Sequence, residues 1–85
     1  MKCFVYILQS ESSGKYYIGI SENPDRRLEF HNTLEKGFTS RYRPWKIVYT
    51  KEFSDRTSAH KVELKLKSWK SKIIMERVIS GEIIL

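Results

Sequence analysis

Four side chains have types and spacings that suit the chemistry of a phosphate group. Tyr6 and Tyr17 lie in two apolar runs of strand length. Arg27 and His31 are four residues apart, a spacing that puts both on one face of a helix. A permanently charged guanidinium beside an imidazole suits a phosphate contact combined with a proton transfer. Each residue taken alone also has an ordinary interpretation, since tyrosine is a good strand former and helical arginines and histidines are often solvated or structural.

Glu63 is the carboxylate in the most useful position. At 100° per residue it lies roughly a quarter-turn from the centre of the apolar stripe of its helix, so it borders the core. Mg²⁺ often takes one or two carboxylates together with waters and substrate phosphates. The residue is therefore either a magnesium ligand or the partner of Lys67 in an i, i+4 ion pair, which stabilises a helix by a few tenths of a kcal/mol.

The register of the first two strands decides whether the two tyrosines act together. If Gln9 faces Tyr16 in an antiparallel pair, then Tyr6 faces Gly19, and Tyr6 and Tyr17 share a face as diagonal neighbours about 7–8 Å apart. A slip of one residue would separate the two phenols. In the predicted register Gly19 shapes the site, because a missing side chain leaves that patch open to a ligand.

The elements that carry these residues are strands and helices of ordinary length. Apolar runs predict strands, and Gly14 is the expected turn residue between the first two. Asn23 suits the N-cap of a helix and Pro24 its first position, and this helix is expected to end near Asn32. The predicted strands cover residues 3–8, 16–20 and 45–53.

The second half of the chain predicts a basic loop at residues 35–44 and a helix that begins after strand 45–53. Ser54 or Asp55 can cap that helix, and it either continues or is followed by another helix that ends at Ser80-Gly81. Its expected apolar positions follow helical spacing: Ala59, Val62, Leu66, Trp69 and Ile73. The order β-β-α-β-α-α predicts an α+β domain over residues 1–80, with a short tail at 81–85 that docks on the core or on a neighbour.

Composition narrows the class of protein. The chain has 85 residues, enough for one modest core, and a net charge of +6. The charge favours a polyanionic partner, either nucleic acid or an anionic membrane surface. A membrane role is disfavoured because the apolar face of residues 59–73 is needed for the core. Cys3 has no second cysteine to pair with, and the N-terminal apolar run is too short for a secretory signal, so a cytoplasmic protein is expected.

Together these residues resemble a known family of nucleases. The segments "VYI" at 5–7 and "YIG" at 17–19, with Arg27, His31 and Glu63, are similar to the GIY-YIG nuclease superfamily. The phrases "YYIGIS", "PDRRLEFHN" and "YRPWKIVY" are similar to its small stand-alone members, related to the N-terminal domain of the bacterial excision-repair nuclease subunit. The first tripeptide departs from the family pattern, because Phe4 stands where the glycine is usual.

The resemblance implies a fold, an activity and roles for the residues. The fold is a three-stranded antiparallel sheet flanked by helices. The activity is endonucleolytic hydrolysis of DNA phosphodiester bonds, structure-selective rather than sequence-selective, with one Mg²⁺ or Mn²⁺ ion on Glu63. Tyr6 and Tyr17 would line the site and Arg27 would contact the scissile phosphate. The general base stays open among Tyr6, Tyr17 and His31.

A basic segment is the candidate substrate-binding surface, and a second function fits the same scaffold. The basic segment 40–46 mixes aromatic and cationic residues, as contacts to single-stranded nucleic acid do, although Trp45 alternatively packs inward. The rival is a non-catalytic module that binds branched or single-stranded nucleic acid on the same scaffold. The residues expected to bind nucleic acid are Arg41, Arg43, Lys46, Lys67 and Lys70.

Overall fold

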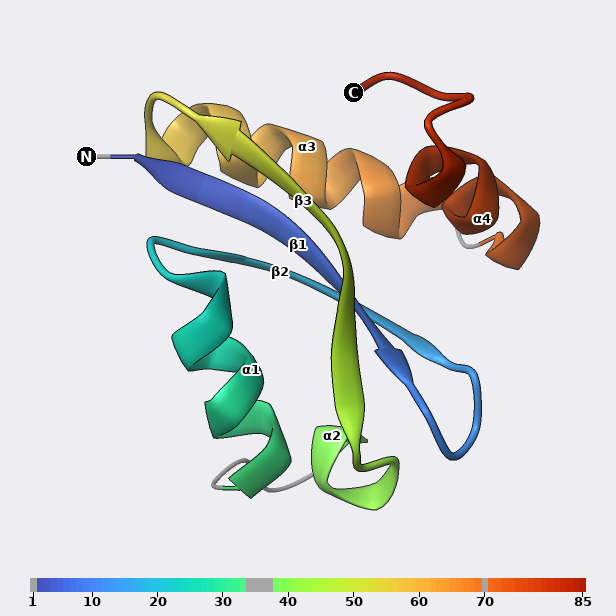
Figure 1. Ribbon diagram of the computed structural model, residues 1–85. Coiled ribbons are helices and arrows are strands. Elements are labelled where there is room, and N and C mark those ends of the chain that lie inside the picture. Colours follow the sequence, from blue (N-terminus) through green and yellow to red (C-terminus); the bar gives the residue numbers. More distant parts are fainter. Residues whose placement is uncertain (1, 34–37, 70) are drawn as a thin grey trace.

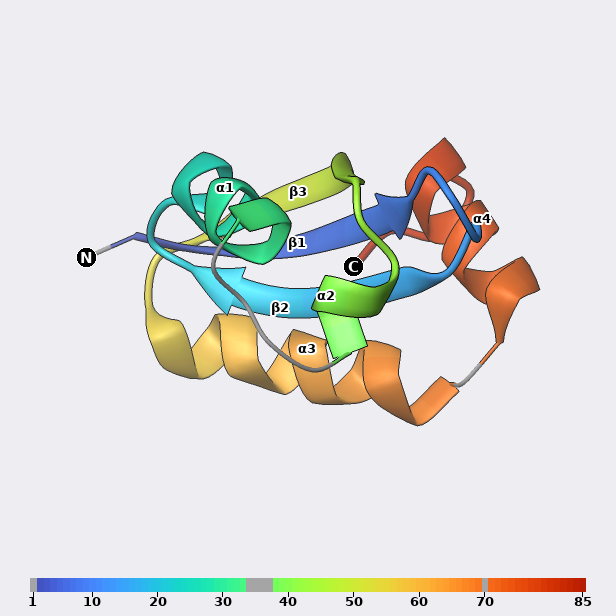
Figure 2. The same cartoon turned by 90° about the horizontal axis from the view of Figure 1, so that it is seen from below.

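The structure is a computed structural model that describes residues 2–33, 38–69 and 71–85 (Figure 1). Within these ranges the elements are β1 (Cys3–Ser10), β2 (Tyr16–Ser21), α1 (Pro24–Thr33), α2 (Phe38–Arg41), β3 (Trp45–Phe53), α3 (Arg56–Trp69) and α4 (Lys72–Ser80). The three strands form one antiparallel sheet of order β2-β1-β3. Helix α1 covers one face of this sheet and α3 covers the other, as the second view shows (Figure 2).

The predicted α+β class is confirmed, and so is the register of the first hairpin. Gln9 pairs with Tyr16, and Tyr6 pairs with Gly19. Gly14 has a φ of 76°, which is the left-handed conformation expected of the turn residue. Because β1 is the central strand, both of its faces are covered and its apolar run is almost continuous.

Alternation along β1 divides the core into two clusters. Cys3, Val5 and Ile7 face α3 and α4, where they meet buried residues such as Leu66 and Val78. The other face carries a second cluster, formed by Tyr6, Leu8 and Trp45 and closed by part-buried neighbours that include Tyr17 and Leu28. The tail contributes to the first cluster, because Ile83 and Leu85 pack against it rather than leaving that surface open.

The helix starts follow the local signals. Asn23 caps α1, with its side-chain oxygen accepting from the Arg26 N–H at 3.2 Å. Asp55 caps α3 in the same way, accepting from the Ser58 N–H at 2.7 Å. These caps fix the first turns of the two helices that carry Arg27 and Glu63.

Two expectations for the helices were wrong in detail. The loop at 35–44 contains the short helix α2, although residues 34–37 lie outside the described residues. Ile73 does not continue the apolar stripe of α3, because α3 ends at Trp69 and the Ser71 hydroxyl caps a separate helix by accepting from the Ile74 N–H. The change of axis turns Ile73 outward, so that it is 63% exposed, while Met75 becomes a core residue.

Candidate functional site

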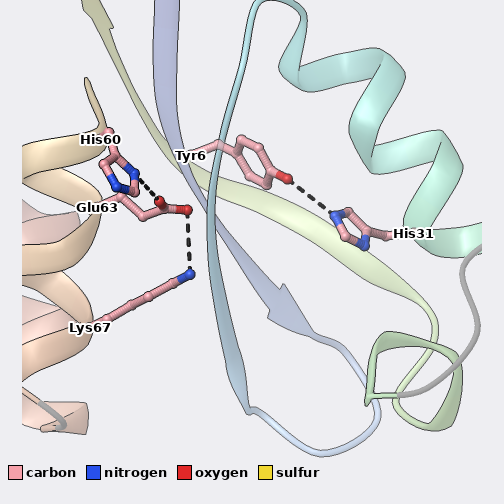
Figure 3. Close-up of polar contacts among 5 residues, drawn as sticks. All are labelled: Tyr6, His31, His60, Glu63 and Lys67. Carbon is pink, nitrogen blue, oxygen red and sulfur yellow. Dashed lines mark hydrogen bonds and ion pairs between the residues drawn. The ribbon is translucent and has the colours of Figure 1, made fainter. Parts of the chain in front are cut away.

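Tyr6 and His31 form a buried polar pair between β1 and α1. The Tyr6 hydroxyl lies 3.1 Å from Nε2 of His31, and the two residues are 1% and 0% exposed (Figure 3). Tyr17 from β2 joins them, since its ring centroid lies 4.6 Å from that of His31. The two tyrosines therefore share one face of the sheet, as the predicted register requires.

The end of α1 is tied to the start of β3, which holds His31 in place. The Asn32 side chain donates to the Trp45 carbonyl at 3.0 Å and accepts from the Trp45 N–H at 2.6 Å. Nε of Arg43 donates to the carbonyl of His31 at 2.8 Å. These contacts join residues more than ten positions apart, so no local pattern predicted Asn32 as a positioning residue.

Gly19 differs from its predicted role. A Cβ built at this position would meet the hydroxyl and the Cζ atom of Tyr6, the latter at 2.6 Å. The space above Gly19 is therefore filled by the Tyr6 phenol rather than open to a ligand, because Tyr6 leans across its cross-strand partner. Glycine is required at this position because it admits a large buried ring.

The charges around Tyr6 show which groups the fold brings near its hydroxyl. Burial is the largest effect and raises the pKa of the Tyr6 phenol above its usual value. A side-chain hydrogen bond with Arg27 and the charge of that guanidinium lower this pKa, whereas Tyr17 and Glu63 raise it. Because the pKa is raised, the phenol stays protonated at neutral pH, and its hydroxyl shares a hydrogen bond with Nε2 of His31.

Glu63 reaches this neighbourhood from α3, on the opposite face of the sheet from α1. Its side chain is 12% exposed, and its two oxygens have different partners (Figure 3). Oε1 lies 3.1 Å from Nδ1 of His60, and Oε2 lies 3.4 Å from Nζ of Lys67. The expected ion pair with Lys67 is present, and so is the position at the border of the core. His60 was missed, although its spacing of three residues from Glu63 is a signal that could have found it.

Two hollows flank the site, and the edge strand β2 lines both. One, of about 630 Å³, is lined by the end of β2 and by cationic residues of two helices: Arg26, Arg27 and Arg56. The Arg27 guanidinium lies over the ring of Phe30, 4.6 Å from its centroid. Sequence reasoning found Arg27 but missed Arg26 and Arg56, because their common hollow joins the starts of two helices that are far apart in the chain.

The second hollow, of about 520 Å³, begins at the other end of β2. Tyr17 and Lys67 line it beside the core residues Leu66 and Met75, and Lys72 lines it from the start of α4. The Lys72 ammonium lies near the hairpin turn, 3.7 Å from where a Cβ on Gly14 would stand. Tyr17 therefore links this hollow to the Tyr6–His31 pair.

The predicted nucleic-acid contacts are distributed unevenly. Arg41 and Lys46 are exposed on the surface. Arg43 is half-buried and holds the His31 carbonyl, and Trp45 is 3% exposed, so the inward alternative is correct for this tryptophan. Lys67 stands beside Glu63 at the second hollow. Lys70 lies outside the described residues.

The donor set around Glu63 fits one hard divalent cation. In the described part of the chain no group of three or more His, Cys, Asp or Glu side chains gathers to form a complete metal cage. The Glu63 carboxylate, whose side chain is 12% exposed, can supply one or two oxygen ligands and leaves the other coordination positions for water and phosphate oxygens, the arrangement that Mg²⁺ favours. The ammonium of Lys67 is the feature that opposes a cation here, since it already neutralises one carboxylate oxygen.

No helix in the described ranges is both long enough and apolar enough to cross a membrane.

Comparisons with known proteins identify the family of the chain. Residues 2–77 match the model of the GIY-YIG catalytic domain. The UPF0213 protein DP2720 of Desulfotalea psychrophila is 41% identical over 66 residues, which cover 75% of this chain and 59% of the relative. The chain therefore spans less than two thirds of that relative's length.

Two further relatives extend the comparison. The "Structure-specific endonuclease subunit SLX1 homolog" of Giardia intestinalis is 41% identical over 66 residues, covering 72% of this chain and 18% of that protein. The solution NMR structure of the UPF0213 protein BH0048 from Bacillus halodurans has a TM-score of 0.59 and 27% identity, and covers 94% of this chain and 84% of that one. Because residues 2–77 match the family model and the fold is similar to that of the UPF0213 protein BH0048, the chain belongs to the GIY-YIG nuclease superfamily.

Proposed function

We propose that the protein is an endonuclease that hydrolyses DNA phosphodiester bonds with one divalent cation. The observation that carries the proposal is the electrostatic neighbourhood of Tyr6. Its phenol is hydrogen-bonded to His31, and Arg27, Tyr17 and Glu63 affect its pKa. Folding brings an anion-binding guanidinium, a candidate metal ligand and two phenols together from both sides of the sheet. Membership of a nuclease family supports the same activity.

Glu63 and Arg27 would share the stabilisation of the phosphate. Glu63 would hold Mg²⁺ or Mn²⁺, and the ion would supply charge for the developing negative oxygens. The Arg27 guanidinium would contact the non-bridging oxygens in a fixed fork, and Phe30 keeps that fork oriented by packing under it. Such preorganised groups act most strongly where charge develops in the transition state.

Tyr17 is the best candidate for the group that meets the attacking water. Tyr6 and His31 are shielded from solvent, whereas Tyr17 is half-buried and lines a hollow. The raised pKa of Tyr6 also makes that phenol harder to ionise, so its phenolate is less available to act as a base. We therefore assign Tyr6 and His31 to positioning the Tyr17 ring, against which His31 packs.

The DNA strand would run along the edge strand β2. The arginine-lined hollow lies at one end of β2 and the hollow with Lys67 and Lys72 at the other, with Gly19 between them. Cationic side chains at both ends would bind phosphates, and such contacts fix the register of a DNA strand without reading its bases. This surface favours structure-selective over sequence-selective cleavage, and the Giardia relative is itself named as a structure-specific endonuclease subunit homolog.

A cleavage assay with matched variants tests the proposal. Duplex, single strand, flap and four-way junction of shuffled sequence are incubated with purified protein and Mg²⁺, and products are resolved on denaturing gels. Glu63→Gln should lose cleavage and keep DNA binding, while Glu52→Gln, which alters an exposed carboxylate paired with Lys2, should change neither. Equal cleavage by Glu63→Gln, in protein purified identically, would refute the metal assignment.

One observation favours a second candidate, a module that binds nucleic acid without cutting it. Both oxygens of Glu63 already have cationic or imidazole partners within 3.4 Å, so the carboxylate is satisfied without a metal ion. The same assay separates the two functions. Salt-sensitive binding to branched DNA, falling by about 0.9 log units per log unit of salt for each duplex phosphate contacted, with no cleavage in any divalent ion would favour the binding module.

A further inference from the structure

We propose that His60 is a second protein ligand of the divalent cation held by Glu63, so that this chain has a mixed imidazole–carboxylate site. The inference rests on the proposed function in one respect, namely that Glu63 binds a metal ion. It adds a ligand that neither the family match nor the names of the relatives assign. It also specifies the cations that the site should prefer.

The distance between the two donor atoms suits a shared ion. Nδ1 of His60 lies 3.1 Å from Oε1 of Glu63. Two adjacent ligands of an octahedral ion with bonds of roughly 2.1 Å are about 3.0 Å apart, so the separation of the two atoms suits a shared ion once the imidazole turns its Nδ1 lone pair from Oε1 toward the ion. His60 is one turn before Glu63 on α3, and the three-residue spacing is that of the Glu-x-x-His metal ligands of helix bundles, with the order of the two residues reversed.

The surroundings permit the exchange of a hydrogen bond for an ion. The His60 side chain is 54% exposed, so solvent and an incoming cation reach the imidazole, whereas the Glu63 side chain is 12% exposed and held in place. Lys67 occupies the other oxygen, Oε2, and can stay there while Oε1 binds the ion through a single oxygen. Coordination of an ion through Nδ1 requires the proton of the neutral ring to be on Nε2.

An imidazole ligand changes the preference among metals. Mg²⁺ prefers oxygen ligands and keeps its waters, while imidazole nitrogen suits first-row transition metals. His60 should therefore strengthen the binding of Co²⁺ and Ni²⁺ markedly, of Mn²⁺ moderately, and of Mg²⁺ little. The competing interpretation is that His60 only orients Glu63 by donating a hydrogen bond, and such an effect would apply to every cation.

The test measures binding of the metal ion alone, without DNA or turnover. Affinities for Mg²⁺, Mn²⁺ and Co²⁺ are measured by calorimetry for the parent protein and for His60→Ala and His60→Gln, with Ser68→Ala as a neutral, exposed control on the same helix. Glutamine keeps an N–H donor for the carboxylate but has no imidazole nitrogen. Pulsed electron paramagnetic resonance of bound Mn²⁺ then reports whether a nitrogen is directly coordinated.

The outcomes separate the ligand role from a positioning role. We expect both His60 variants to lose at least tenfold in Co²⁺ affinity with less than a threefold change for Mg²⁺, and to lose the nitrogen coupling of bound Mn²⁺. Equal losses for all three ions, rescue by His60→Gln, or absence of nitrogen coupling in the parent protein would overturn the inference. Glu63→Gln should abolish binding of every ion, and if it does not, the metal assignment itself fails rather than the role of His60.

Discussion

Replacing Gly19 with alanine tests the close contact between β2 and the buried phenol of Tyr6. The added Cβ would stand 2.6 Å from Cζ of Tyr6, well inside van der Waals contact, and the ring has no open space to enter because Tyr6 is 1% exposed. The backbone of Gly19 is not in the left-handed region, so alanine adds no backbone strain there. The cost must therefore come from displacing the ring.

The magnitude follows from three contributions. Overpacking costs roughly 1–3 kcal/mol, and weakening the hydrogen bond from Tyr6 to His31 costs about 1 kcal/mol. The lower entropy of the unfolded chain with alanine offsets about 0.5–1 kcal/mol. The net loss should be about 2 kcal/mol, which lowers the Tm of a domain of this size by roughly 8–16 °C.

Urea denaturation of a double-mutant cycle isolates the steric effect. Tyr6→Leu removes the ring atoms that alanine would meet, so Gly19→Ala should cost less than about 0.5 kcal/mol in that background. The rate of DNA cleavage by Gly19→Ala should also decrease, because the Tyr6 ring is displaced. The reasoning is refuted if alanine costs the same in both backgrounds, or if the single variant is as stable as the parent protein.

The other predictions concern the charges and phenols of the site. In single-turnover cleavage, Arg27→Ala should reduce turnover roughly 10²–10³-fold. Arg27→Lys should restore little of this activity, because an ammonium does not reproduce the guanidinium fork, and full rescue by lysine would contradict a bidentate contact. Tyr17→Phe should reduce turnover about 10²-fold or more without changing stability. Tyr6→Phe should instead lower the free energy of unfolding by about 1 kcal/mol, because it removes the hydrogen bond to His31. The reverse pattern would make Tyr6 the general base. The Ser58 N–H lowers the pKa of Asp55, so this cap stabilises the fold above the unfolded-state pKa and the contribution is lost as the pH falls through the folded-state value. Asp55→Asn should remove that part of the acid dependence in urea titrations at several pH values, and an unchanged pH profile would argue against it.

Local patterns predicted the strands, the turn and the starts of α1 and α3 of this protein. Alternation and apolar runs are properties of neighbouring residues, and so are the Asn23-Pro24 start of α1 and the glycine turn at Gly14. The hairpin register was a condition of the sequence interpretation rather than its result, because β1 is apolar on both faces; the structure sets it by pairing Gln9 with Tyr16. Once the register was set, the shared face of Tyr6 and Tyr17 followed directly.

Only the tertiary structure decided what occupies the space around those residues. The Tyr6 phenol fills the position above Gly19, Asn32 ties α1 to Trp45, and Arg26 and Arg56 meet in one hollow. Each of these contacts joins segments that are distant in the chain, and side-chain size and charge alone do not say which distant segments will meet. The site therefore depends on how α1 and α3 pack on opposite faces of the sheet, where both helices contact the edge strand β2.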